Sequence, residues 1–161
     1  MISVGQTIPS IASKTFADGP IDFNLSESLA GQIAIVIGVP GAFTGVCTQQ
    51  HVPAFVEQAD ALKAAGVEAV YCVSVNDPFV LNGWKDVMGA EGVTFVSDWN
   101  AELTKAMGLD LDISAAGLGV RSKRYMMVVQ NGQVKDLQIE DNPGAFDVSG
   151  PQNALKALAA L

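Results

Sequence analysis

Apolar runs alternate with amphipathic stretches along most of the chain, which is typical of strands and helices that follow one another. Residues 33–39 and 67–75 are mostly apolar and rich in β-branched side chains, a pattern that predicts two strands buried on both faces of a sheet. Between them, apolar side chains recur at the spacing of an amphipathic helix that ends at Gly66. Pro53 lies inside this helix, so we expect its first turn to be offset or kinked. The apolar helix positions are Val52, Phe55, Val56, Ala59 and Leu62.

The remainder of the chain predicts further elements of both kinds. Asn76-Asp77-Pro78 offers a capping side chain before a proline, which indicates the start of a helix that runs to Met88. Asn131-Gly132 is a strong hairpin signal. The other expected elements are a strand at 93–96, a helix at 100–107, a loop at 110–120, hairpin strands at 125–130 and 133–139, and a terminal helix from Ser149 to Leu161. We therefore predict one α/β domain over residues 1–161, with a mixed sheet and helices on both faces.

Composition limits the classes of function. The chain has 161 residues, of which 49% are hydrophobic, enough for the core of one domain. Nine Lys and Arg against 17 Asp and Glu give a net charge of −8, so we expect no nucleic-acid and no membrane partner. No apolar run has the roughly 18 to 20 residues of a membrane-spanning helix, and the first residues do not resemble a signal peptide. These features predict a cytoplasmic location.

Cys47 is the first candidate for chemistry. It lies just beyond the strand at 33–39 and near the start of the following helix, where unpaired N–H groups and the helix dipole favour a thiolate. The alternative is a small buried hydrophobe, the usual fate of a free cysteine. Thr44 precedes Cys47 by three residues, a spacing that can return its hydroxyl to the sulfur, although a plain helix cap explains it as well.

Three of the nine basic residues gather just before the strand at 125–130: Arg121, Lys123 and Arg124. A solvated cluster at a strand end is the ordinary interpretation. Side-chain alternation along the strand favours Arg124 as the one that points inward, where its guanidinium would hold a thiolate charged.

The single histidine, His51, and the second cysteine, Cys72, have simpler interpretations. His51 follows Cys47 by four residues, and a Cys-His pair would suggest a thiol hydrolase, but we favour a residue of the helix surface or of an interface. Cys72 lies in a predicted buried strand, which favours core packing. One histidine and two separated cysteines have no zinc-ligand spacing, and no glycine-rich phosphate motif is present. We predict no metal and no cofactor.

The segment from Val39 to Phe55 resembles the active-site loop of the peroxiredoxins, in the Pro-Gly-Ala-Phe-Thr form of the type II branch that is linked to glutaredoxin or thioredoxin. The resemblance spans nearly the whole chain. It implies a thioredoxin-like fold with an N-terminal extension and a thiol-dependent peroxidase. The other segments that resemble this branch are residues 72–80, Trp84, residues 95–98 and residues 117–125.

The resemblance also implies roles for particular residues. Cys47 matches the peroxidatic cysteine, Thr44 the threonine that bonds thiolate and peroxide, Pro40 the proline that shields the pocket, and Arg124 the arginine that activates the sulfur. Arg121 does not match that role. We expect four more residues to contact the substrate, hydrogen peroxide or an alkyl hydroperoxide: Gly41, Phe43, Val46 and Leu118.

One departure from the family concerns recycling. Relatives that resolve their sulfenic acid internally carry a late cysteine before the last helix, and residues 143–149 have none here. We therefore expect an external thiol to act as the reductant, most simply glutathione with glutaredoxin, with thioredoxin as the alternative reductant. The alternative function for the chain is a redox-sensing thiol protein that is oxidised once and then acts through a partner. The family also implies a homodimer, for which His51 and Trp84 are the candidate contacts.

Overall fold

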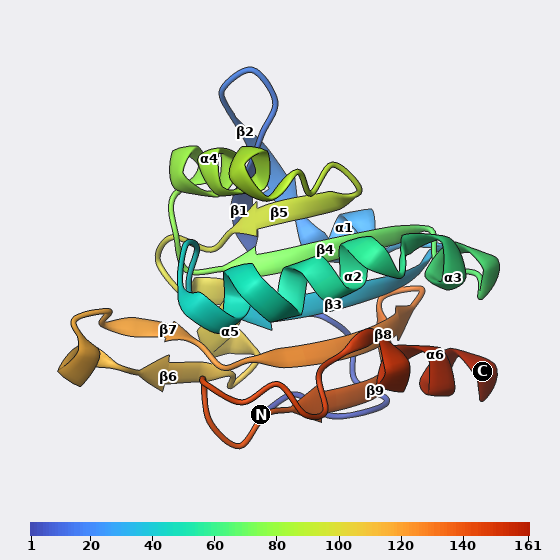
Figure 1. Ribbon diagram of the computed structural model, residues 1–161. Helices are drawn as coiled ribbons and strands as arrows, with labels where there is room; N and C mark the ends of the chain where they lie inside the picture. The colour runs from blue at the N-terminus through green and yellow to red at the C-terminus, as the bar shows by residue number, and fades with distance from the viewer.

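A seven-stranded mixed sheet forms the centre of the protein in the computed structural model, which describes all residues from 1 to 161 (Figure 1). Its strand order is β2-β1-β5-β4-β3-β8-β9. The central strands β3, β4 and β5 are parallel, while β8 runs antiparallel to β3 and pairs with β9 in a hairpin. The predicted mixed sheet is therefore present. The strands are β1 (Ala12–Phe16), β2 (Pro20–Asn24), β3 (Ile33–Val39), β4 (Ala69–Ser74), β5 (Val93–Ser97), β8 (Tyr125–Gln130) and β9 (Gln133–Ile139).

Helices cover both faces of this sheet, as predicted (Figure 1). One face packs against α2 (Val52–Glu57), α3 (Ala59–Ala64), α4 (Pro78–Met88) and α6 (Pro151–Ala159). The other face packs against α1 (Leu25–Ser28) and α5 (Glu102–Ala106). Because successive side chains of a strand point to opposite faces, Ile35 and Ile37 enter the first core and Ala34 and Val36 the second. No helix is long and apolar enough to cross a membrane.

The register between β3 and β8 depends on a close approach at Gly38. Gly38 pairs with Tyr125, and a Cβ atom on Gly38 would lie 2.0 Å from Cε1 of the tyrosine ring. Only glycine leaves room for that ring. The pairing places Arg124, one residue before Tyr125, at the carboxyl end of β3, on the face of the first core.

The predicted helix that ends at Gly66 is divided into three pieces. A π-helical turn, η1 (Cys47–His51), precedes α2 and α3. The Val52 N–H donates to the Cys47 carbonyl five residues earlier, and Pro53 has no N–H to continue the ordinary four-residue ladder. The expected offset at Pro53 is thus a π-helical turn, an irregularity that is often found at functional sites.

Two segments differ from the sequence-based expectation. The prediction of a loop at 110–120 is wrong in part. This segment contains the strand β6 (Asp110–Asp112) and the single turn η2 (Ser114–Ala116). The strand β7 (Val120–Ser122) pairs with β6 in a separate small sheet. Strands of three residues are too short to show an alternating pattern. The N-terminal hairpin β1–β2 was also not predicted, although the Asp18-Gly19 pair that turns it is a hairpin signal.

Candidate active site

Cys47 lies at the start of the helical segment, at the carboxyl end of β3. The first backbone hydrogen bond of this segment runs from the Thr48 N–H to the Thr44 carbonyl, so the N–H groups of Val46 and Cys47 have no carbonyl partner within the helix. The Cys47 sulfur is fully buried. It accepts hydrogen bonds from Thr44 Oγ1 at 3.0 Å and from Arg124 Nη2 at 3.1 Å. The structure therefore brings together the three residues that the sequence singled out.

Arg124 is almost fully buried, at 2% exposure, and each edge of its guanidinium has a partner. Nε and Nη2 donate to the Pro143 carbonyl at 3.3 and 3.0 Å. Nη2 also donates to the Cys47 sulfur, and Nη1 donates to His51 Nδ1 at 3.0 Å. These bonds use four of the five N–H groups of the guanidinium. One N–H on Nη1 remains for another acceptor.

No carboxylate forms an ion pair with this buried cation, although Glu140 and Asp141 line the same small cavity as Arg124. The one ion pair between side chains of the protein joins Lys14 to Asp22 on the β1–β2 hairpin, and the partners of Arg124 are a sulfur, a carbonyl and an imidazole. A buried charge without a counterion is costly. Among these partners, only the Cys47 sulfur can become an anion and so balance the charge of the guanidinium.

The Thr44 hydroxyl has one proton and two acceptors within reach. Its oxygen lies 2.7 Å from the Gly41 carbonyl and 3.0 Å from the Cys47 sulfur. A neutral thiol can donate to the Thr44 oxygen while the hydroxyl donates to Gly41. When the sulfur ionises, the hydroxyl proton can turn to it, so Thr44 serves both protonation states.

His51 is not a surface residue, and that interpretation was wrong. The imidazole is fully buried; Nδ1 accepts from Arg124, and Nε2 lies 3.1 Å from the Ser149 carbonyl. The pKa of His51 is lowered to about 3, mainly by burial and then by the Arg124 charge, and the hydrogen bond with the Ser149 carbonyl opposes this only in part. A neutral imidazole that accepts at Nδ1 and donates at Nε2 has no lone pair free for the Cys47 proton, which removes the basis for a thiol hydrolase.

Trp84 is equally buried. Its indole N–H has a partner inside the protein, because it donates to Thr48 Oγ1 at 3.0 Å. His51 and Trp84 were the candidate contacts of a dimer, and neither has exposed surface to offer. Both residues instead hold the π-helical turn η1 in place through hydrogen bonds inside the protein. The sequence spacing could not show this, since their partners come from distant elements.

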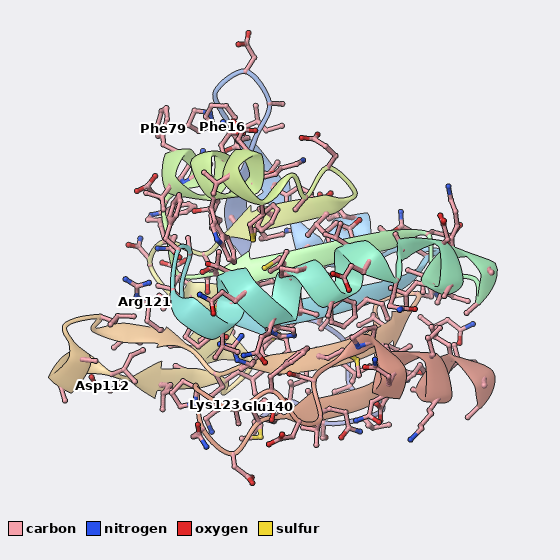
Figure 2. The ribbon with its side chains drawn as sticks, in the orientation of Figure 1. Phe16, Phe79, Asp112, Arg121, Lys123 and Glu140 are labelled. Carbon is pink, nitrogen blue, oxygen red and sulfur yellow. The ribbon has the colours of Figure 1, made fainter.

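The loop from Pro40 to Val46 is fastened from two sides. The Ala42 N–H donates to Asn76 Oδ1 at 2.9 Å, and Arg121 Nη1 donates to the Pro40 carbonyl at 3.3 Å. Arg121 extends toward this loop in Figure 2, and its Nε donates to the Leu118 carbonyl. Arg121 thus links the Leu118 carbonyl group to the Pro40–Val46 loop. Phe43 has a positive φ of 62° and is 54% exposed, so the side chain of Phe43 lies at the protein surface.

Comparison with known proteins fits this geometry. The Redoxin family model matches residues 3–155. The chain is 44% identical to peroxiredoxin-2E-2, chloroplastic, of Oryza sativa subsp. japonica, over 98% of this chain and 72% of that protein. It is 42% identical to peroxiredoxin-2C of the same plant, over 98% of each chain. The chain belongs to the peroxiredoxins. A crystal structure of reduced Prx3 in complex with H2O2 from Vibrio vulnificus superimposes on this peroxiredoxin with a TM-score of 0.93 and 39% identity, and the match covers 98% of this chain and 99% of that one.

The fold of this peroxiredoxin is thioredoxin-like, with an N-terminal extension that forms the β1–β2 hairpin. Membership of the family makes the protein a thiol peroxidase of the oxidoreductase class. No group of three or more His, Cys, Asp or Glu side chains is arranged to hold a metal ion.

Sequence reasoning missed two polar residues that shape the site. The expected cap before Pro78 is confirmed, because the Asp77 carboxylate accepts from the Val80 N–H, but no separate role was predicted for Asn76. Asn76 holds the Pro40–Val46 loop. Glu140, labelled in Figure 2, follows β9, and its Oε1 accepts from three consecutive N–H groups, those of residues 147–149, and from the Ser149 hydroxyl.

These hydrogen bonds to Glu140 fix the shape of the loop formed by residues 141–149. Two carbonyl groups of this loop then contact residues of the site. The Pro143 carbonyl accepts from Arg124, and the Ser149 carbonyl accepts from His51. Burial raises the pKa of Glu140, but the hydrogen bonds from Ser149, Val148 and Asp147 outweigh it and hold the pKa below its usual value. The carboxylate form therefore fastens this loop.

Cys72 occupies the middle of β4, between β3 and β5. It is fully buried in the same core as Cys47, which confirms the prediction of core packing. Burial raises the pKa of Cys72 well above its ordinary value, and the neighbouring Cys47 raises it further. Cys72 is thus a protonated thiol fixed within a sheet.

Proposed function

We propose that Cys47 is the residue at which this peroxiredoxin reduces hydrogen peroxide and alkyl hydroperoxides, and that an external thiol restores it. The observation that carries the proposal is the buried Arg124 guanidinium, which donates to the Cys47 sulfur and forms no ion pair with a carboxylate. The Vibrio vulnificus relative is described as a reduced protein in complex with H2O2, which supports the same substrate for this chain.

The proposed reaction begins with the Cys47 thiolate attacking the nearer peroxide oxygen in line with the O–O bond. An S–O bond forms as the O–O bond breaks, and the sulfur is oxidised to a sulfenic acid. The departing oxygen takes a proton and leaves as water or as an alcohol. Arg124, with one unused N–H, and Thr44 stabilise the charge that builds on the two oxygens.

The loop before Cys47 is proposed to form the peroxide pocket. Pro40 shields the sulfur from bulk water, and Gly41 and Val46 contact the peroxide. Phe43 and Leu118 supply apolar surface at the rim, which suits alkyl hydroperoxides as well as hydrogen peroxide. The exposed ring of Phe43 supports this arrangement.

Glutathione with glutaredoxin is the proposed reductant. A thiolate of glutathione attacks the sulfenic sulfur, the S–O bond breaks as the hydroxyl group takes up a proton from solvent and leaves as water, and a mixed disulfide forms at Cys47. Glutaredoxin or a second glutathione then attacks the glutathione sulfur and releases the Cys47 thiolate. The position of Cys72 supports an external thiol, because Cys72 is buried in the middle of a strand that is paired on both sides, and a disulfide requires a specific geometry of the two cysteines. The 141–149 loop contains no cysteine.

The test is steady-state peroxide consumption by the purified protein, measured once with glutathione and glutaredoxin and once with thioredoxin and its reductase. We expect turnover with the glutathione system, no turnover in C47S, and nearly full turnover in C72S. Peroxide consumption by C47S would refute the role of Cys47. Turnover with thioredoxin alone would replace the proposed reductant while leaving the peroxidase in place.

A redox-sensing protein is the second candidate, because the buried thiolate could be oxidised once and then act through a partner. Failure of every thiol donor to support turnover, with Cys47 still oxidised by peroxide, would favour it. The homodimer and the cytoplasmic location stay predictions; relatives of this chain include proteins named as chloroplastic and mitochondrial.

A further inference from the structure

His51 is a buried titratable group that contacts Arg124 and that the proposed reaction does not use. It is fully buried, 73 residues from Arg124 in sequence, and it joins that residue to the 141–149 loop. Its ring also packs against Phe55 and Phe146, with centroid separations of 5.8 and 5.2 Å. The imidazole is therefore fixed in position and in tautomer.

The Arg124 guanidinium needs a partner on the Nη1 side. The Pro143 carbonyl holds the edge formed by Nε and Nη2, but a single acceptor atom allows the plane of the group to tilt. His51 Nδ1 provides a second, separate acceptor. Two acceptors at different edges of the planar group define its orientation, so that Nη2 meets the sulfur at 3.1 Å.

The chemical nature of this partner matters as much as its position. A carboxylate in place of the imidazole would pair with the guanidinium and compete with the sulfur for its charge. A neutral nitrogen accepts the hydrogen bond and leaves the positive charge to the sulfur and to the oxygen that departs. The low pKa of His51 is consistent with this role, because it keeps the ring uncharged beside Arg124.

We propose that His51 is a positioning residue for the peroxidase reaction: it orients Arg124 toward the sulfur and the peroxide through Nδ1 while contributing no charge of its own. The inference rests on the proposed role of Cys47. Its substrate-contacting partner is Arg124, and His51 itself touches neither the sulfur nor the peroxide.

Three substitutions separate this role from general packing. H51F keeps the ring but removes both hydrogen bonds. H51N places an amide oxygen one bond beyond Cγ, where Nδ1 lies, and restores the acceptor for Arg124. H51Q carries the same amide group one bond further out, toward Ser149, and misplaces that acceptor. V52A, in which the next buried residue is truncated, is the control for lost stability.

Two rate constants are measured for each variant by stopped flow: oxidation by hydrogen peroxide and alkylation by iodoacetamide. Alkylation requires the thiolate but no donor to a departing oxygen, so the ratio of the two rates reports on the orientation of Arg124. We expect the ratio to fall about tenfold or more in H51F and H51Q, and to lie within about threefold of wild type in H51N and V52A. If H51F does not fold, the comparison of H51N with H51Q provides the test.

An unchanged ratio in H51F and H51Q would overturn the inference, as would equal losses of both rates or an H51N variant as slow as H51Q. These outcomes are distinct from failure of the proposed function. That failure would appear in the wild-type protein itself, as peroxide consumption that does not require Cys47.

Discussion

Arg124 shows how far residue-scale reasoning from the sequence extends. Alternation along the strand at 125–130 selected it over Arg121, and the structure places its guanidinium against the Cys47 sulfur. The partners that orient it were not predictable, because His51, Pro143 and Ser149 meet only after three distant segments fold together. The spacing of four residues between Cys47 and His51 indicated a shared helix side and nothing about which side.

A pH dependence of stability follows from His51. Its pKa is about 3 in the folded protein and about 6.5 when the ring is in water, so between these values the unfolded chain binds a proton that the folded protein does not. Folding is therefore favoured above pH 6.5 and loses stability as the pH falls, by about 1.4 kcal/mol per unit from this group.

The measurement is urea unfolding of wild type and H51N at pH 7 and pH 5. We expect the wild type to lose about 2 kcal/mol more than H51N over this interval. Glu140, whose pKa is lowered, loses its contribution in the same direction as the pH falls, and it is present in both proteins. Equal losses in the two proteins would show that His51 is protonated in the folded state.

At the scale of elements, the pairing of β3 with β8 positions Arg124. Both strands were predictable from their apolar runs, and the hairpin from Asn131-Gly132, but the pairing of β3 with β8 was not. The fit of Tyr125 over Gly38 sets it. A shift of one residue would turn Arg124 to the opposite face of the sheet, away from Cys47.

The substitution G38A tests this contact. The added methyl group would collide with the Tyr125 ring, so we expect a loss of about 1 to 3 kcal/mol in the free energy of unfolding and a slower reaction with peroxide. G92A is the matched control, because a Cβ on Gly92 meets no atom within 4 Å, and its effect should stay within about 0.5 kcal/mol. Urea unfolding measures both. A neutral G38A would mean that Tyr125 does not fix the register.

At the scale of the whole molecule, the mixed sheet with helices on both faces was predictable, because long periodic segments carry strong signals. The N-terminal hairpin and the small β6–β7 sheet were not, because their strands are short and largely exposed. The 141–149 loop has no apolar pattern either, and its shape comes from the Glu140 carboxylate. Yet this loop supplies both carbonyls that hold the Arg124 and His51 pair, so part of the site could be found only in the folded structure.

The two cysteines allow a direct test of the central claim, that Cys47 is the peroxide-reactive thiol. Reduced protein is treated with one equivalent of hydrogen peroxide in the presence of dimedone, which traps sulfenic acids, and each cysteine is then examined by peptide mass spectrometry. The account predicts one dimedone adduct, on Cys47, with Cys72 unmodified inside the sheet. An adduct on Cys72 with Cys47 unmodified, or a Cys47–Cys72 disulfide as the main product, would contradict it.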